Sequence, residues 1–169
     1  MKVFIVGYMY SGKTTLGKKL AKKLGKDFFD IDQYFEQKYK ISVQDFFEKY
    51  DEGAFRKLEK DILAEIIQKD DFVLSTGGGT PCFYGNMDLI NKSGISVYLK
   101  MAPESIAHRA LNSRKPRPLF KNLSDSEIPA FIRRHLAERE YFYKTAHIQF
   151  KGENARVEEL ISRIHDFSE

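Results

Sequence analysis

The residues from Gly7 to Thr14, GYMYSGKT, have the types and spacing of a phosphate-binding loop and match G-x-x-x-x-G-K-[ST] at every fixed position. The glycines let the backbone turn its N–H groups toward phosphate oxygens, and a following helix adds partial positive charge. We expect Lys13 to contact the β and γ phosphates of a nucleotide and the Thr14 hydroxyl to bind Mg²⁺. A glycine turn before a lysine-rich helix is the weaker alternative. The predicted nucleotide-binding residues here are Gly7, Tyr10, Ser11, Gly12, Lys13, Thr14 and Thr15.

Two aspartates, Asp30 and Asp32, follow the second short apolar run. If the strand continues through them, alternation aims both side chains to one side. One carboxylate of such a pair can support a magnesium ion, while the other accepts a hydrogen bond from a substrate hydroxyl and assists its deprotonation. A solvated strand end or a helix N-cap is the alternative, and it is favoured when the pair is taken alone.

Arg56 lies beside the apolar stripe of a helix predicted from about Ala54 to Lys69. A guanidinium group suits a planar carboxylate, which it binds with two parallel hydrogen bonds. The alternative is a surface arginine paired with Glu52 or Glu59. A later arginine, Arg139, has a helix-surface salt bridge as its own alternative.

Three consecutive glycines close the third apolar run, and backbone this bare serves either a sharp turn or the close approach of a ligand. They are Gly77, Gly78 and Gly79. Farther along, the basic, proline-rich stretch from Arg114 to Leu119 predicts a lid that lays an arginine over a transferring phosphoryl group. A nucleic-acid patch is the alternative for this stretch, but no stacking aromatic residues alternate with its charges.

The apolar pattern along the chain alternates between short strands and amphipathic helices. Predicted strands are Lys2–Val6, Phe28–Ile31, Phe72–Ser75, Ile95–Leu99 and His147–Phe150. Predicted helices span about 13–24, 43–50, 54–69, 84–91 and 103–111, then a long helix from the Ser124/Glu127 capping box to about 143, and finally 156–164. The alternation predicts an α/β fold whose parallel sheet is covered on both faces, with ligands at the carboxyl ends of the strands.

Composition narrows the class of protein. The 169 residues are 42% hydrophobic and 31% charged, as expected for a single soluble domain. A formal net charge of +4 favours anionic ligands weakly and does not by itself mark a nucleic-acid binder. The single cysteine, Cys82, excludes an internal disulfide, and no apolar run has the length of a membrane span or of a signal-peptide core. We therefore expect a cytoplasmic protein.

Taken together and in this order, GYMYSGKTT, FFDID, FRKLE, STGGGT, KPRPLF and AEREYFY closely resemble shikimate kinases, a family of P-loop kinases similar to nucleoside monophosphate kinases. The resemblance covers nearly the whole chain. It implies a three-layer α/β/α fold with a five-stranded parallel sheet of order 2-3-1-4-5, as one domain over residues 1–169. Within it, a substrate-binding segment is expected at about 33–61 and a mobile lid at about 112–123.

By the same resemblance, the protein transfers the γ-phosphoryl group of ATP to the 3-hydroxyl of shikimate with Mg²⁺, on the route to chorismate and aromatic amino acids. The implied roles are Arg56 and Arg139 for the substrate carboxylate, Gly77, Gly78 and Gly79 for approach to the ring, Asp32 for the reacting hydroxyl, Asp30 near the metal, and Arg117 with Lys13 for the transferring group. Adenine is assigned to Arg109 rather than Arg114. We expect a monomer with a small-molecule substrate and no nucleic-acid or membrane partner.

The chain departs from the family pattern at two places. Tyr10 stands where the family usually has a glycine, and Thr80, Pro81 and Cys82 replace the small and aliphatic residues expected after the three glycines. Three rival functions remain at this stage: a gluconate kinase, a nucleoside monophosphate kinase, and a non-catalytic protein that binds nucleotides or nucleic acid. The nucleic-acid rival predicts salt-sensitive binding without turnover.

Overall fold

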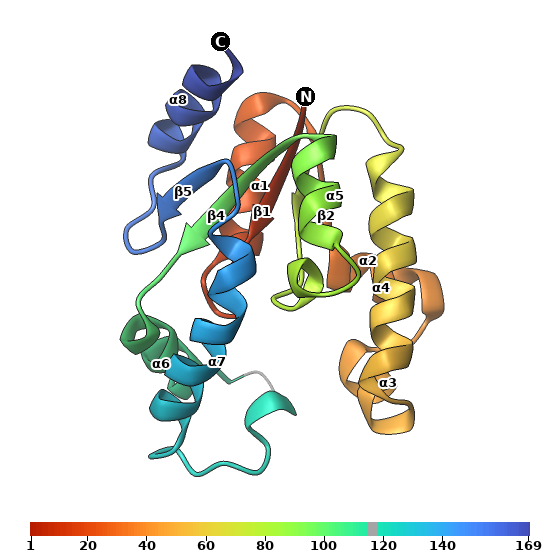
Figure 1. The fold of residues 1–169 in the computed structure, drawn as a ribbon, viewed down its shortest axis with the longest axis vertical. Coiled ribbons are helices and arrows are strands. Elements are labelled where there is room, and N and C mark those ends of the chain that lie inside the picture. Colours follow the sequence, from red (N-terminus) through yellow and green to blue (C-terminus); the bar gives the residue numbers. More distant parts are fainter. Residues whose placement is uncertain (115–117) are drawn as a thin grey trace.

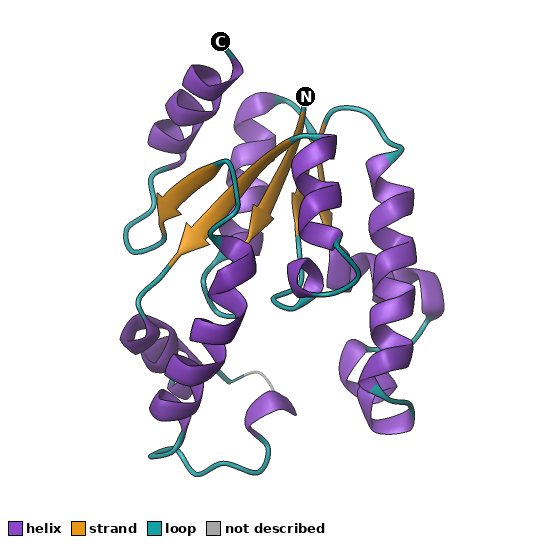
Figure 2. Ribbon diagram, viewed as in Figure 1, coloured by secondary structure: helices purple, strands orange, loops and turns teal. Residues whose placement is uncertain are grey.

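The computed structural model describes residues 1–114 and 118–169, which build a sheet flanked by helices (Figures 1 and 2). The five strands are β1 Lys2–Val6, β2 Asp27–Asp30, β3 Phe72–Ser75, β4 Ile95–Lys100 and β5 Ile148–Lys151. Their order is β2-β3-β1-β4-β5 and every neighbouring pair is parallel, as the sequence predicted.

Among the described residues, each strand is followed by one or more helices. They are α1 Lys13–Leu24, α2 Ile31–Tyr39, α3 Val43–Lys49, α4 Glu52–Ile67, α5 Asn86–Ser93, α6 Pro103–Leu111, α7 Ile128–Tyr143 and α8 Val157–Ser168, with short 3₁₀ turns η1 Thr80–Cys82 and η2 Pro118–Phe120. In the ranges 1–114 and 118–169, no helix is long and apolar enough to cross a bilayer.

Residues of β1 alternate between two apolar cores, one on each face of the sheet. Val3 and Ile5 pack with residues of α1 and α8, whereas Phe4 and Val6 pack with residues of α4, α5 and α7. The three-layer architecture follows directly from this burial of β1 on both faces (Figure 2).

Helix α2 corrects the sequence prediction around the two aspartates. The strand ends at Asp30, one residue earlier than predicted, and α2 begins at once at Ile31 without a loop. The Asp30 side chain caps this helix, and Ile31 and Phe35, four residues apart, are its buried residues. The expectation that strand alternation aligns Asp30 with Asp32 was therefore wrong, because Asp32 lies in the first turn of α2.

The strands end at a common edge, and two groups of helices extend past it (Figure 1). One group holds α6 and the lower part of α7, and the other holds α3 and the first turns of α4. A cavity of about 530 Å³ separates α3 from the segment around η2. Its lining residues include Phe47 and Glu48 of α3, with Phe120 and Leu123 from the other side. The edge between these groups is where the predicted site residues meet.

Candidate active site

The phosphate loop between β1 and α1 has the backbone shape and the buried polar groups that an anion needs. Gly12 caps α1 with a left-handed φ of 94°, which favours glycine. The Lys13 ammonium group is buried and donates to the Tyr8 carbonyl at 2.8 Å. Burial lowers the pKa of Lys13 to about 8, although Asp32 and Asp30 oppose the shift. The Ser11 hydroxyl is also buried and lacks a hydrogen-bond partner among the described residues, so the loop offers donors to a ligand with negative charge.

Tyr10 takes the backbone conformation that a glycine prefers at this position. Its φ is +63°, and its carbonyl accepts a hydrogen bond from the Arg109 guanidinium at 3.1 Å. Its ring lies nearly parallel to that of Phe120, with 6.4 Å between ring centroids. The departure from the family pattern therefore leaves the loop shape intact and adds a contact to η2. Both Arg109 and Arg114 are exposed, and Arg109 lies against the phosphate loop.

Thr14 and Asp30 meet beside the phosphate loop. The Thr14 hydroxyl donates to Asp30 Oδ2 at 2.6 Å, and Ser75 Oγ lies 3.5 Å from the same hydroxyl. Asp30 Oδ1 accepts from the backbone N–H groups of Asp32 and Gln33 at 3.1 and 3.2 Å. Asp30 thus caps a helix, as one interpretation of this residue expected, and it also contacts the predicted metal-binding hydroxyl; its role beside a metal stays a prediction.

These oxygen donors fit a magnesium ion that is held mainly by a nucleotide. Mg²⁺ prefers hard oxygen ligands and is usually bound by one or two protein groups together with phosphates and water. Within residues 1–114 and 118–169, no group of three or more His, Cys, Asp or Glu side chains is placed to hold a metal alone. A hydroxyl and one carboxylate at the edge of the loop match that pattern.

Asp32 lies between the phosphate loop and the three glycines. Burial raises the pKa of its carboxyl group to about 7, and the charges of Asp30 and Glu59 add to the shift against the opposing charge of Lys13. A side-chain carbon added at Gly77 would lie 3.4 Å from Asp32 Oδ1. A carboxyl group that titrates near neutral pH beside a bare backbone has the properties of a proton acceptor for a bound hydroxyl.

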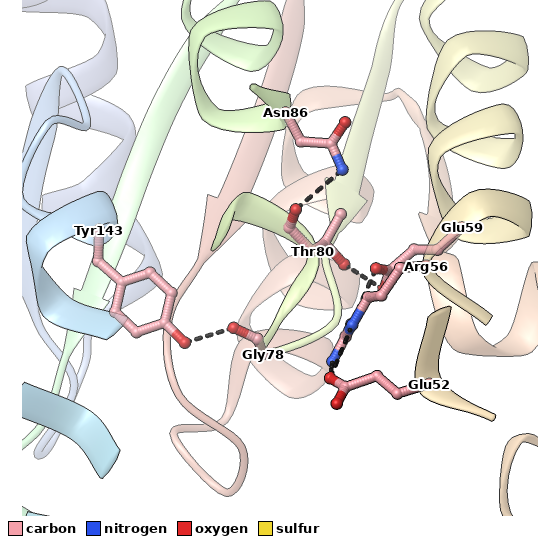
Figure 3. A network of polar contacts seen from close by, with 7 residues as sticks. All are labelled: Glu52, Arg56, Glu59, Gly78, Thr80, Asn86 and Tyr143. Atoms are coloured by element: carbon pink, nitrogen blue, oxygen red, sulfur yellow. Dashed lines mark hydrogen bonds and ion pairs between the residues drawn. The ribbon is translucent and has the colours of Figure 1, made fainter. Parts of the chain in front are cut away.

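Arg56 of α4 is 7% exposed and is bound by two carboxylates (Figure 3). Nη1 donates to Glu59 Oε1 at 2.9 Å, while Nε and Nη2 both donate to Glu52 Oε1 at 3.2 Å. The guanidinium packs so closely on Gly79 that any side chain there would clash with it. The surface-arginine alternative is therefore wrong about exposure, although Arg56 does pair with both Glu52 and Glu59.

Arg139 of α7 reaches the same glycines from the other side of the site. A side-chain carbon added at Gly78 would lie 3.1 Å from Arg139 Nη1. The guanidinium lies 5.9 Å from the centre of the Tyr8 ring, and its charge also acts on the Tyr143 hydroxyl. Tyr143 also donates to the Gly78 carbonyl (Figure 3). Arg139 is thus part of the site lining and not a helix-surface salt bridge.

Several residues around the two arginines were not assigned to the site from sequence. Tyr8 hydrogen-bonds His135 Nδ1 at 2.9 Å, across 127 residues of chain, and no local pattern announces that contact. Burial, followed by the charge of Arg139, lowers the pKa of His135 to about 4, so its ring is neutral. Tyr143 is four residues after Arg139 on one helix face, and this spacing is a signal that sequence reasoning can use.

The residues after the three glycines form η1. Thr80 is fully buried, and Cys82 is half-buried. Burial raises the pKa of the Cys82 thiol to about 11, although Arg139 and Arg56 act in the opposite direction, so the thiol is not activated. Thr15, at the start of α1, is exposed. The predicted phosphoryl-binding residue Arg117 lies outside the described residues.

Comparison with known proteins agrees with this geometry. A model of the shikimate kinase family matches residues 9–169. The chain is 44% identical over 164 residues to the shikimate kinase of Azobacteroides pseudotrichonymphae, covering 96% of each protein. It is also similar to the crystal structure of shikimate kinase from Bacteroides thetaiotaomicron, with a TM-score of 0.90, 36% identity, and coverage of 98% of this chain and 97% of that one. Shikimate kinase from Acinetobacter baumannii in complex with shikimate gives a TM-score of 0.87 and 32% identity, with coverage of 97% and 90%.

Proposed function

This chain belongs to the shikimate kinase family of ATP-dependent kinases, and from that premise we propose how its residues phosphorylate the 3-hydroxyl of shikimate. The observation that carries the proposal is the meeting of Lys13 and Asp32 at the strand ends, where each charge perturbs the pKa of the other. The cation belongs to a phosphate loop and the carboxylate faces the bare glycines. A phosphoryl donor and a hydroxylated acceptor therefore have adjacent places.

On the donor side, the loop backbone and the Ser11 hydroxyl bind the phosphates of ATP, and Lys13 contacts the transferring group. Incoming phosphate charge favours the protonated form of this buried lysine. Thr14 and Asp30 would hold Mg²⁺, which neutralises charge on the β and γ phosphates when bound. Further nucleotide contacts come from Gly7, Tyr10, Gly12, Thr15 and Arg109, the last of these at the adenine.

On the acceptor side, Asp32 accepts the hydrogen bond of the reacting hydroxyl and orients it for in-line attack. A carboxyl pKa near 7 lets Asp32 bind and release this proton near neutral pH. Transfer through a loose transition state demands little deprotonation beforehand, so positioning is the larger part of its role.

Arg56 and Arg139 bind the acceptor carboxylate from opposite sides of the three glycines. Both guanidinium groups already lie against that loop, Arg56 on Gly79 and Arg139 on Gly78. With Gly77, these glycines leave the backbone open to close approach by the ring of the acceptor. The two-sided arrangement fits a ring that carries one carboxylate, and it favours shikimate over gluconate as the acceptor.

We propose that residues 1–169 act as one domain, as a monomer in the cytoplasm. The segment at about 33–61 supplies acceptor contacts, and the segment at about 112–123 acts as a mobile lid that brings Arg117 to the transferring phosphoryl group. The basic composition of the lid stretch, with Arg114, Lys115 and Arg117, supports a cover that closes over negatively charged phosphates. Nucleic acid and membranes are not partners in this proposal.

The test is ADP release by the purified protein with ATP and Mg²⁺, with shikimate, gluconate and nucleoside monophosphates compared as acceptors. We expect fast release with shikimate alone. Release with another acceptor would keep the phosphate loop and overturn the roles of Arg56 and Arg139. A lack of release with every acceptor, together with salt-sensitive nucleic-acid binding, would support the non-catalytic rival.

A further inference from the structure

Thr80 is held in place by three hydrogen bonds to residues in different parts of the fold. Its N–H donates to the Gly77 carbonyl at 3.3 Å, and its carbonyl accepts from Asn86 Nδ2 at 2.9 Å. Its hydroxyl donates to Glu59 Oε2 at 2.7 Å (Figure 3). Thr80 and Asn86 are both 0% exposed. A residue this constrained holds its hydroxyl at a defined point.

Glu59 connects Thr80 to Arg56, because each of its carboxylate oxygens accepts a hydrogen bond from a different one of these two residues. Oε2 accepts from Thr80, and Oε1 accepts from Arg56 Nη1 at 2.9 Å. Glu59 is 1% exposed, so water does not replace either donor. The orientation of the carboxylate plane, and with it the position of Nη1, depends on both hydrogen bonds.

We propose that Thr80 is a positioning residue for acceptor binding, whose hydroxyl orients Glu59 and thereby holds the Arg56 guanidinium in its place on Gly79. The inference rests on the proposed function, because it assigns Arg56 to the acceptor carboxylate. Two parallel hydrogen bonds to a carboxylate require the guanidinium plane to be correctly oriented, and a supporting residue provides this orientation. Thr80 does not touch the acceptor in this account.

The contacts define what each substitution at position 80 removes. Valine keeps the shape of threonine but places a methyl group against Glu59 Oε2, which leaves a buried carboxylate oxygen without its donor. Serine keeps the hydroxyl and loses only a methyl group. The pair Thr80→Val and Thr80→Ser therefore separates the hydrogen bond from the packing.

The experiment is steady-state kinetics of wild type, Thr80→Val and Thr80→Ser with shikimate and ATP varied separately. We expect Thr80→Val to raise the KM for shikimate about tenfold, as for the loss of one hydrogen bond to a charged group. The KM for ATP and kcat should change less than about threefold, because the phosphate loop is untouched. Thr80→Ser should restore the wild-type KM for shikimate.

Ser96→Ala serves as the matched control for loss of a buried hydroxyl. Ser96 is 0% exposed and hydrogen-bonds Asn91 and His147 at the opposite end of the sheet. Its removal should lower thermal stability and leave the KM for shikimate unchanged. Thr80→Val with a wild-type KM, Thr80→Ser with a tenfold raised KM, or equal changes in both KM values would overturn the inference. A wild-type protein inactive with shikimate would instead overturn the proposed function.

Discussion

The two arginines of the acceptor site are supported in opposite ways. Arg56, on α4, is bound by the carboxylates of Glu52 and Glu59 and is 7% exposed. Arg139, on α7, lies against the Tyr8 ring and acts on the Tyr143 hydroxyl, which are uncharged groups. The α4 side of the site is thus acidic, while the α7 side is aromatic.

Because of this difference, we expect Arg56 to orient a bound carboxylate and Arg139 to attract it electrostatically. The charge of Arg56 is already balanced by carboxylates, so an incoming carboxylate gains a fixed pair of donors but little net electrostatic attraction. Arg139 is supported without a neutralising charge from these partners, so its positive charge is available to the ligand. One of these carboxylates, Glu59, also helps to raise the pKa of Asp32. Under the proposed roles, the acidic side would tune Asp32 for the reacting hydroxyl, and the aromatic side would leave the charge of Arg139 free to bind the acceptor carboxylate.

Asp32→Asn tests the acidic side with the largest expected effect. Loss of a positioned proton acceptor should lower kcat by about 10²- to 10⁴-fold. ATP binding should persist, because the phosphate loop keeps its donors. The measurement is kcat from ADP release, alongside ATP affinity by calorimetry. Full turnover in this variant would remove Asp32 from the site.

The pH profile provides the control for that result. With the pKa of Asp32 raised to about 7, kcat/KM of the wild type should fall as the pH drops below about 7, and Asp32→Asn should lack this limb. The folded chain holds this proton more tightly than the unfolded chain, so ionisation of Asp32 lowers stability as the pH rises from 3.8 toward about 7. Asp32→Asn should therefore raise Tm at pH 8, and a lower Tm would contradict the assigned pKa.

Arg56→Ala should damage folding as well as binding. It leaves Glu59, whose side chain is 2% exposed, as a buried and unpaired charge, a change that typically costs about 3–5 kcal/mol. For a chain of this size, Tm should fall on the order of 10 °C. Thermal unfolding followed by circular dichroism measures it. An unchanged Tm would show that the acidic side does not depend on Arg56.

Arg139→Ala should weaken binding and leave the fold intact. Its partners are uncharged, so its removal strands no buried charge. Loss of its hydrogen bonds to the acceptor should raise the KM for shikimate about 10- to 100-fold with Tm nearly unchanged. Steady-state kinetics measures the KM for shikimate, and thermal unfolding of the same preparation measures Tm. A large drop in Tm would contradict this prediction, because it would show that the fold depends on Arg139 as well as on Arg56.

Tyr143→Phe gives the smallest of these effects and sharpens the account of the aromatic side. The variant keeps the ring, which is fully buried, and removes the hydroxyl that hydrogen-bonds Gly78, the glycine that Arg139 also approaches. A neutral hydrogen bond contributes about 1 kcal/mol, so the KM for shikimate should rise a few-fold. The KM for ATP is the internal control, and an equal rise in both values would mean that Tyr143 acts on the whole fold.

Part of the fold and of the candidate site could be predicted from the sequence. The phosphate loop was predictable residue by residue, because its motif is contiguous and each position has a local physical reason. The sheet order was implied by family resemblance, and it agrees with the structure. The geometric reason for pairing Asp30 with Asp32 was wrong, because the onset of α2 at Ile31 was not recognised.

The contacts that hold the candidate site residues join segments far apart in the chain, and they could not be predicted from the sequence. The contact of Thr80 with Glu59 joins residues 21 positions apart, and that of Tyr8 with His135 joins residues 127 apart. Such contacts depend on how α4 and α7 dock on the sheet, and periodicity within one element does not encode docking. The sequence pointed to the two arginines as candidates, whereas the groups that contact them were visible only in the three-dimensional structure.

Calorimetric titration tests most directly whether Arg56 and Arg139 bind the acceptor through its carboxylate. The wild-type protein, without nucleotide, is titrated with shikimate and with its uncharged methyl ester. The account predicts that the ester binds at least about tenfold more weakly, because neither arginine then meets a charged carboxylate. Equal affinities for the two ligands would contradict the claim that Arg56 and Arg139 bind the acceptor through its carboxylate.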